Sequence, residues 1–379
     1  MTPHSDLTNE SMPFLIDGHL DLAWNALSFD RDLTEPVERI NAHERGMTDH
    51  RARGNSTVAL PEMRRANMAV CLATVLAHAR PDLRPIEGHL RTSLEYRSPT
   101  AACAIGHGQL AYYKLLEQQS ELVMLRSRDD LNAHWDRCAS RPESIANGST
   151  PIGYILAMEG ADPIIAPSRV TEWFDFGLRV LGPVHYGHNQ YAHGTGESGP
   201  LTNEGIALLR ECERIGLIVD TTHLADESFF HALDVFRGPV IASHQNCRAL
   251  VPGARQFSDE QLQLLIERDA VIGASFDNWM IVPDWKKGET SRSKAILAKI
   301  ADHTEHICQL AGSHRHVAIG TDLDGGFGSE QSPAEITTIA DVQQFADILR
   351  RRGFTSAAID DIFHGNWLRF FRDHLPNSN

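Results

Sequence analysis

Histidine and acidic side chains follow several apolar stretches of this 379-residue sequence, and these side-chain types suit metal binding or acid–base chemistry. The first example is the segment FLIDGHLDL, which begins at Phe14 and contains His19 and Asp21. Because the two residues lie two positions apart, they project from the same face of an extended strand. An imidazole beside a carboxylate suits a divalent metal such as zinc. The alternative is a polar pair at a solvated strand end, and this segment alone does not decide between the two.

The same pattern returns where later apolar runs stop, at Glu159, His185, His223, His244 and Asp322. A single histidine at the end of a strand is usually structural, but here six strands end in metal ligands or acid–base groups. One metal ion needs about four donors, so this set predicts two ions, with Glu159 as the carboxylate that bridges them. A hydroxide between the two ions would then be the nucleophile, because both ions lower the pKa of bound water.

Eight short apolar segments alternate with segments of helix length, which is typical of a parallel sheet covered by helices. The predicted strands span residues 14–19, 68–76, 153–158, 178–184, 217–222, 239–243, 270–275 and 317–321. Eight strands predict an α/β fold, a (β/α)₈ TIM barrel, whose strands end at one common rim. A doubly wound open sheet is the alternative, but it needs a glycine-rich phosphate turn after the first strand, and DGHLD is not one.

We expect a single domain over residues 1–379, with an insertion at about 79–120 that begins with a stretch rich in Pro, Arg and Gly. Residues 122–125 read as an extra short strand, and residues 23–66 as largely irregular apart from a helix at 36–47. Further helices are predicted at about 106–119, 129–137, 203–215, 226–236, 258–268 and 291–310. Three of them would begin with the capping residues Asn203, Asp226 and Ser258.

The composition argues against a protein that binds nucleic acid, spans a membrane or is secreted. A net charge of −15 argues against a nucleic-acid or anionic-membrane surface, because phosphate groups are bound by clustered Lys and Arg. No apolar run approaches the ~20 residues that span a bilayer, and the N-terminus lacks the basic and apolar parts of a secretory signal. The 6 Cys form no CxxC pair and suit a reducing compartment. These features predict a cytoplasmic protein with no membrane partner.

Several motifs match a known family. They are DGHLD, Glu159-Gly160, the strand end at His185, LTNEGIALLRECERIGLIVDTTH, PVIASHQNCRAL, ARQFSDEQL and IGTDLDG, between about residues 14 and 328. On these motifs the chain resembles the membrane (renal-type) dipeptidases, peptidase family M19 of the amidohydrolase superfamily. The resemblance implies an amidohydrolase-like (β/α)₈ barrel with two Zn²⁺ per chain, in agreement with the pattern of strand ends.

The resemblance also implies a division of the metal ligands. His19 and Asp21 would hold the first ion, His223 and His244 the second, and Glu159 would bridge them. Nitrogen and oxygen donors of this kind also bind other divalent ions such as Mn or Co.

The substrate-facing residues are likewise carried over from the family pattern. His185 would bind and polarise the scissile carbonyl, and Arg255 would bind the terminal carboxylate of the substrate, for which an Arg fork is suited. Asp322 would act as the acid–base residue, and we prefer it to Asp324 because it follows the apolar strand directly. His188 and His193 depart from the mammalian sequences of the family. The alternatives for these two residues are contact with the substrate, binding of a further metal ion, or a plain loop position, and we favour the loop position.

The main hypothesis is a zinc-dependent dipeptidase that cleaves the amide next to a free C-terminal carboxylate. Some relatives accept a D-residue at the C-terminal position, and the sequence leaves this preference open. One alternative is another amidohydrolase reaction, such as lactone or cyclic amide hydrolysis, at the same binuclear centre. A second alternative is a catalytically silent metal-binding or assembly protein, which the intact set of candidate ligands disfavours. A homodimer is compatible with the resemblance.

Overall fold

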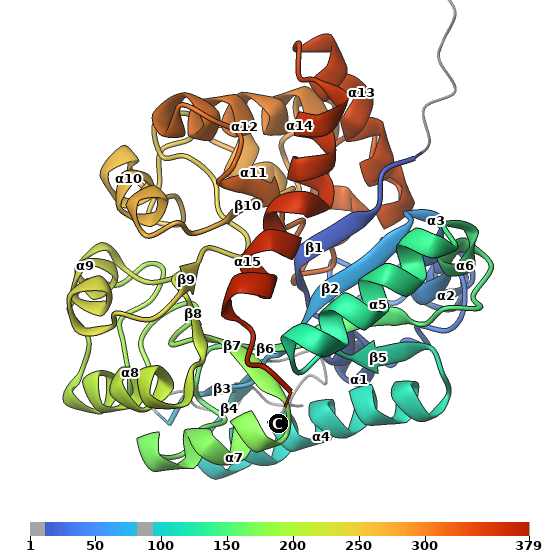
Figure 1. Cartoon of the computed structure of the whole chain (residues 1–379). Coiled ribbons are helices and arrows are strands. Elements are labelled where there is room, and N and C mark those ends of the chain that lie inside the picture. The colour runs from blue at the N-terminus through green and yellow to red at the C-terminus, as the bar shows by residue number, and fades with distance from the viewer. Residues whose placement is uncertain (1–11, 82–93, 379) are drawn as a thin grey trace, which may run out of the picture.

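Parallel strands form the centre of the molecule, and helices surround them (Figure 1). The computed structural model describes residues 12–81 and 94–378. Eight central strands each overlap one of the predicted segments: β1 (Leu15–Leu20), β2 (Met68–Val75), β6 (Ile152–Glu159), β7 (Leu178–Gly182), β8 (Ile218–Asp220), β9 (Val240–Ile241), β10 (Ile272–Ala274) and β11 (Val317–Ile319). All pairings among them are parallel, as predicted.

The central strands follow one another around a barrel. Strands β1, β2, β6, β7, β8 and β9 are hydrogen-bonded in that order. Ala242, just after β9, forms a parallel bridge with Ile272 of β10, and β10 pairs with β11. β11 in turn contacts β1, where the Thr321 N–H donates to the Asp17 carboxylate at 2.9 Å. The predicted α/β barrel is therefore confirmed, and the carboxyl ends of its strands share one rim.

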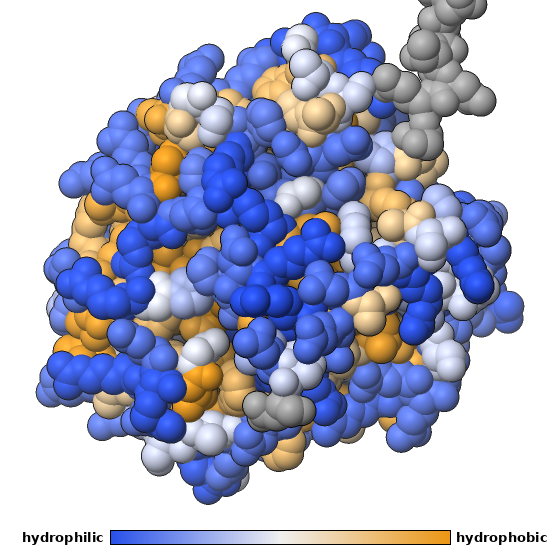
Figure 2. Space-filling model, viewed as in Figure 1, coloured by the Kyte–Doolittle hydropathy of each residue, from blue (hydrophilic) through white to orange (hydrophobic). Residues whose placement is uncertain are grey.

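Helices cover the outside of the barrel and close one of its ends (Figure 1). They are α1 (Leu22–Phe29), α2 (Val37–His43), α3 (Leu60–Arg65), α4 (Pro99–Gln118), α5 (Arg128–Ser140), α6 (Glu143–Ala146), α7 (Val170–Asp175), α8 (Asn203–Ile215), α9 (Asp226–Val235), α10 (Asp259–Glu267), α11 (Asn278–Ile281), α12 (Leu297–Ala311), α13 (Gln344–Arg351), α14 (Ser356–Asp360) and α15 (Asn366–His374). Figure 2 shows that hydrophilic residues cover most of the face over α15, with apolar groups in separate small areas. No helix in the described part of the chain is long and apolar enough to cross a membrane.

Alternate residues of the strands belong to two separate apolar clusters. Ile155 of β6 packs in the same cluster as Trp367, Phe370 and Phe371 of α15, whereas its neighbour Leu156 packs in the larger cluster that includes most of the helices. This alternation is expected of a barrel strand, whose side chains point in turn to the interior and to the helices. α15 therefore fills the amino end of the barrel and leaves the carboxyl end for the site.

Gly18 is required by this packing. A Cβ atom at Gly18 would lie 2.5 Å from the Ser243 carbonyl oxygen and 2.7 Å from a ring carbon of Trp367. The Trp367 ring is fixed in turn, because its Nε1–H donates to the Ile319 carbonyl at 2.8 Å. The close approach of these groups lets β1 carry His19 into the barrel mouth.

The insertion and the N-terminal region contain more regular structure than predicted. α4 begins at Pro99, about seven residues before the predicted start, because Ser98 caps it by accepting from the Ala101 N–H at 3.1 Å and Pro99 suits the first helical position. α1 and α3 lie in a region predicted to be largely irregular. The insertion also contains β3 (His78–Ala79) paired with β4 (Glu95–Tyr96), and its residues 82–93 lie outside the described residues.

Two of the three predicted helix caps are wrong by one residue. Thr202, not Asn203, caps α8 by accepting from the Gly205 N–H at 3.0 Å, and Ala225 precedes α9 without a side-chain cap. Ser258 does cap α10, in a capping box with Gln261. The extra strand β5 (Leu122–Met124) pairs with the first part of β6, as a short addition to the barrel.

Candidate functional site

The predicted site residues meet at the carboxyl end of the barrel. His19 lies in β1, Glu159 is the last residue of β6, and His223 follows β8. The others follow their strands in the same way: Asp21 after β1, His185 after β7, His244 after β9 and Asp322 after β11. Asp21, Glu159, His185, His223, Arg255 and Asp322 line one cavity of about 330 Å³. The barrel topology thus gathers residues that are up to three hundred positions apart in the chain.

Glu159 lies at the centre of this group, and its two oxygens face different partners. Oε1 is 3.1 Å from His223 Nε2 and 3.3 Å from His244 Nε2. Oε2 is 3.5 Å from His19 Nε2 and 3.8 Å from His185 Nε2. A carboxylate whose oxygens point to two separate groups of donors has the geometry of a bridge between two cations.

Two further carboxylates, those of Asp21 and Asp322, lie close to His19. His19 Nε2 lies 3.7 Å from Asp21 Oδ1 and 3.9 Å from Asp322 Oδ1. Three sets of three side chains have donor atoms close enough together to share an ion: His19 with Asp21 and Asp322, His19 with Glu159 and His244, and Glu159 with His185 and His223. His19 Nε2 and Glu159 Oε1 are also buried without a hydrogen-bond partner. Buried polar atoms of this kind are normally satisfied, so the nitrogen and oxygen donors present here fit a divalent metal centre.

Hydroxyl groups behind the histidines orient their rings. Thr195 Oγ1 lies 3.0 Å from His223 Nδ1, and Ser243 Oγ lies 2.8 Å from His244 Nδ1. If each Nδ1–H donates to its hydroxyl, each Nε2 presents a lone pair toward Glu159. His223 Nε2 and His244 Nε2 are 3.1 Å apart and both face the same point, as expected of two ligands of one ion.

The surroundings keep three of the histidines neutral. Burial, with the positive charge of Arg255, lowers the pKa values of His223 and His244 well below the usual value. The pKa of His185 is also lowered well below it, first by burial and then by His78, whose ring centroid is 4.6 Å away. A neutral imidazole is the form that binds a metal or donates a single hydrogen bond, so these shifts suit the predicted roles.

The surroundings of His19 shift its pKa in the opposite direction from those of the other three histidines. Burial alone would lower the pKa of His19, but the nearby Glu159 and Asp21 carboxylates raise it well above its usual value. Burial also raises the pKa values of Glu159 and Asp322, since charged carboxylates are disfavoured away from water. Several carboxylates around one buried nitrogen create a negative potential, and that potential would bind a cation in place of the proton.

Two buried carboxylates that the sequence did not single out hold the strand ends in register. Asp17 accepts from the His19 N–H at 3.1 Å and from the Thr321 Oγ–H at 2.6 Å, which joins the ends of β1 and β11. Asp220 accepts from the Thr222 and Ser243 N–H groups, both at 3.0 Å, which joins the turns after β8 and β9. The alternation that places Asp17 on the same face as His19 was the signal that could have identified it.

The backbone is strained at two of the site residues, His223 and Asp322. His223 and Asp322 have φ values of 69° and 59°, in the left-handed region that few non-glycine residues adopt. Such conformations cost free energy and are found preferentially at functional sites. The contacts from Asp17 and Asp220 hold the flanking turns in place.

Asp322 and Asp324 have different surroundings. Asp322 lines the cavity, and no hydrogen bond to its carboxylate is found in the described part of the chain. Asp324 is buried outside the site, where its carboxylate accepts from the Ser56 Oγ–H at 2.8 Å, the Thr57 N–H at 2.8 Å and the Val58 N–H at 3.1 Å. Asp324 therefore anchors a loop, and only Asp322 is available to the site.

Arg255 forms part of the cavity wall and is fixed from behind. Its Nη1 donates to Gln245 Oε1 at 2.7 Å, and its Nη2 donates to the His244 carbonyl at 2.9 Å. The side chain is 5% exposed, and its charge acts on Glu159 and Asp322. A guanidinium held at this position can bind an anionic group of a ligand beside the candidate metal centre.

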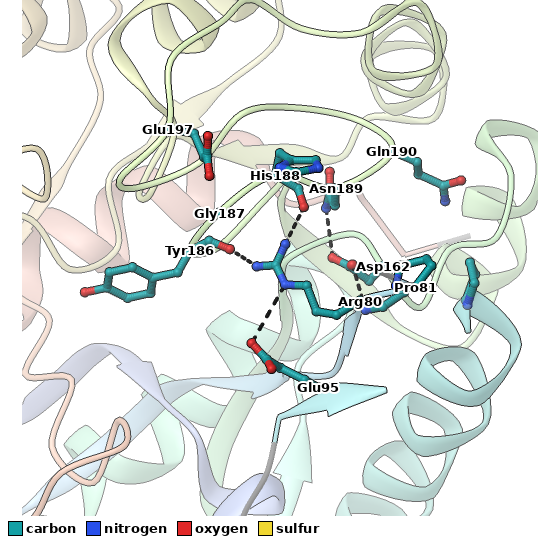
Figure 3. A pocket seen from close by; sticks show the side chains of 12 residues that line it. Arg80, Pro81, Glu95, Asp162, Tyr186, Gly187, His188, Asn189, Gln190 and Glu197 are labelled. Carbon is teal, nitrogen blue, oxygen red and sulfur yellow. Dashed lines mark hydrogen bonds and ion pairs between the residues drawn. The ribbon is translucent and has the colours of Figure 1, made fainter. Parts of the chain in front are cut away.

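A larger cavity of about 580 Å³ lies next to the site, behind the loop that carries His185 (Figure 3). Figure 3 shows that Arg80 reaches from the end of β3 to the carbonyl oxygens of Tyr186 and His188. Glu95 lies 3.9 Å from the Arg80 guanidinium, and Asp162 accepts from the Asn189 Nδ2–H at 2.8 Å. Because most of these polar groups bind one another, this cavity supports the loop and offers little free polar surface to a ligand.

His188 and His193 are loop residues, as predicted. They form an antiparallel bridge with each other, and His193 Nδ1 lies 2.8 Å from the Pro200 carbonyl. Neither residue belongs to the groups that could share a metal in the described structure. All six cysteines are free.

Comparison with known proteins agrees with this geometry. The sequence model of the family described as membrane dipeptidase (peptidase family M19) matches residues 5–378. The chain is 29% identical to dipeptidase aclJ of Aspergillus oryzae over 237 residues, which are 60% of this chain and 53% of that protein. It thus spans about half the length of the fungal dipeptidases that it matches.

Solved structures share the fold over almost the whole chain. One is a metallopeptidase from Rhodobacter sphaeroides, liganded with a phosphinate mimic of the dipeptide L-Ala-D-Ala, with a TM-score of 0.74 and 20% identity over 97% of this chain and 100% of that one. Another is the probable dipeptidase PvdM from Pseudomonas aeruginosa, with a TM-score of 0.72 and 16% identity over 96% of both chains.

Proposed function

Because the chain belongs to the membrane dipeptidase family, peptidase family M19, we propose that it is a zinc-dependent dipeptidase that hydrolyses dipeptides with a free C-terminal carboxylate. The observation that carries this proposal is the position of Glu159, whose two oxygens face separate groups of donors beside the buried Arg255. The family supplies the reaction class, and this arrangement indicates which residues of this chain would perform it.

The proposed metal ligands, divided as the resemblance to the family implies, are His19 and Asp21 for one ion, His223 and His244 for the other, and Glu159 for both. Two divalent cations held there would supply Lewis acidity and would lower the pKa of a water between them. We propose two Zn²⁺ per chain, and the same donors would also accept Mn or Co.

The remaining residues would bind the dipeptide and move protons. Arg255 would bind the C-terminal carboxylate, which orients the scissile amide toward Glu159. His185 Nε2, 3.8 Å from Glu159 Oε2, would donate to the carbonyl oxygen and stabilise its developing negative charge. Asp322 would accept a proton from the attacking water and pass it to the departing amine. Burial raises the pKa of Asp322, which favours a group that both takes and returns a proton.

The proposal is tested on protein that is stripped of metal and reloaded with Zn²⁺, Mn²⁺ or Co²⁺. The substrates are L-Ala-L-Ala and L-Ala-D-Ala, their C-terminal amides, and a panel of lactones and cyclic amides. We expect hydrolysis of the free dipeptides, including the form with a D-residue. The amides should be poor substrates, because they lack the carboxylate that Arg255 would bind. Hydrolysis of lactones or cyclic amides alone would refute the dipeptidase and favour another amidohydrolase reaction at the same centre.

The metallopeptidase from Rhodobacter sphaeroides shares the fold of this chain at 20% identity and was solved with a mimic of L-Ala-D-Ala. This ligand is the reason to include a dipeptide with a D-residue among the substrates. The homodimer, the single domain with its insertion and the cytoplasmic location stay predictions from the sequence.

A further inference from the structure

Two basic side chains besides Arg255 line the cavity of the candidate site. Arg51 lies in the turn between α2 and α3, and Lys287 lies in the segment between α11 and α12. Both are exposed at the rim, whereas Arg255 is buried. Among the described residues, three with positive side chains therefore line the cavity that contains the candidate metal centre.

The two rim cations have no carboxylate partner. In the described part of the chain, no ion pair within 4 Å involves Arg51 or Lys287. Their sequence neighbours differ, because Arg53 pairs with Glu44 at 2.9 Å and Lys286 lies 3.8 Å from Glu289. Other basic residues on these two loops thus form ion pairs with carboxylates, whereas Arg51 and Lys287, which line the cavity, do not.

The acidic groups among the described lining residues offset this charge only in part, because none of them lies within 4 Å of Arg51 or Lys287. Glu95 lies 3.9 Å from Arg80, and Asp21, Glu159 and Asp322 face the candidate metal centre. Asp277 remains, and one of its oxygens already accepts from the Trp279 N–H and the Gln331 side chain. Burial lowers the pKa of Lys287, the Asp277 carboxylate is the strongest charge that opposes this effect, and Arg51 lowers the pKa by a smaller amount. The Lys287 ammonium also lies over the Trp279 ring, 5.2 Å from its centroid. A dipeptide whose terminal carboxylate binds Arg255 would leave a positive charge at the rim unpaired.

We propose that the site prefers dipeptides with aspartate or glutamate at the C-terminal position, and that Lys287, assisted by Arg51, binds the side-chain carboxylate. This inference rests on the proposed dipeptidase function. Lys287, Arg51 and Arg255 line the same cavity of about 330 Å³, together with Asp277 and Asp322. A C-terminal dicarboxylic residue carries its two negative groups close together and matches two neighbouring cations.

Steady-state kinetics on the metal-loaded protein test this preference. The substrates are Ala-Ala, Ala-Asp and Asp-Ala, with the C-terminal residue in both L and D forms. We expect kcat/KM for Ala-Asp to exceed that for Ala-Ala by about 10-fold, mainly through KM, because the added charge pair lies in a partly desolvated cavity. Lys287→Gln should remove this advantage, so that kcat/KM for Ala-Asp and for Ala-Ala become equal within about twofold in that variant. Lys286→Gln, one residue away and outside the cavity lining, is the matched control and should behave as the wild type.

Binding provides a readout that does not depend on turnover. Calorimetric titration of the metal-loaded protein with free aspartate and with free alanine should show tighter binding of aspartate, and Lys287→Gln should remove the difference. Equal kcat/KM values for Ala-Asp and Ala-Ala, or a preference for Asp-Ala, would overturn the inference while leaving the dipeptidase intact. Failure to cleave any dipeptide would instead refute the proposed function, and the inference would fall with it.

Discussion

Asparagine substitutions at Asp322 and Asp324 should have opposite effects, although the two residues are only two positions apart. Both have positive φ values, 59° and 62°, which asparagine also tolerates, so neither substitution strains the backbone. Asp322→Asn removes the charge of a side chain that is 13% exposed and has no hydrogen-bond donor among the described residues. We expect its stability and metal content to stay close to those of the wild type, and kcat to fall by ~10²–10⁴, as for the loss of an acid–base group.

Asp324→Asn should instead unfold the region around residues 55–58. The two carboxylate oxygens accept from the Thr57 and Val58 N–H groups, and Arg31 Nη1 lies 3.5 Å away. An asparagine amide has one acceptor oxygen, so its NH₂ group would face a backbone N–H that cannot turn away. One unsatisfied amide and a weakened buried ion pair together cost about 3 to 5 kcal/mol.

Both variants are measured by urea unfolding, metal analysis and dipeptide turnover. A stable, metal-loaded Asp322→Asn protein with normal kcat would refute the role of Asp322. A stable Asp324→Asn protein that has lost turnover would assign the proton transfer to Asp324 instead.

The remaining predictions concern the substrate carboxylate, the histidine orientation and the response to acid. Arg255→Lys keeps the charge but loses the two-pronged guanidinium, so KM should rise by about 10-fold at unchanged kcat, and a fall in kcat alone would show a different role. Thr195→Val removes the partner of His223 Nδ1 and should weaken zinc affinity about 10- to 100-fold in a competitive chelator titration, whereas unchanged affinity would refute the orienting role. Burial lowers the pKa of His303 to about 4, and its Nδ1 accepts from the Cys247 N–H at 3.1 Å, so the unfolded chain binds the proton first as the pH falls. The free energy of unfolding present above about pH 6.5 should therefore decrease toward pH 4, by about 2 kcal/mol at pH 5. In urea unfolding of the metal-free proteins, this free energy should decrease less steeply with falling pH for His303→Gln than for the wild type.

The residues at the rim of the site were predictable because their positions follow from the order of strands along the sequence. Each candidate ligand directly follows an apolar strand segment, and parallel strands in a barrel all end on one side. His19, Glu159 and His223 could therefore be placed together without any knowledge of distances. The choice of Asp322 over Asp324 followed from the same position in the chain, and the structure adds the reason that Asp324 is occupied elsewhere.

Features that depend on contacts across the barrel were not predictable. The sequence could point to Asp17 as a residue on the same face as His19, but only the strand register shows that Asp17 reaches the Thr321 amide and Asp220 the Ser243 amide. Thr202 and Asn203 are both good capping residues, and the extended backbone of Thr202 decides between them. The charged rim of Arg51 and Lys287 comes from two loops far apart in the sequence, so no local pattern marks it.

The bridging role of Glu159 is tested most directly by a crystal structure of the zinc-loaded protein with anomalous data collected at the zinc edge. Two anomalous peaks are expected, roughly 3.5–4 Å apart, each about 2.0–2.2 Å from a different oxygen of Glu159. One peak should be bound by His19 and Asp21, and the other by His223 and His244. A single peak, or peaks that do not share Glu159, would contradict the binuclear centre.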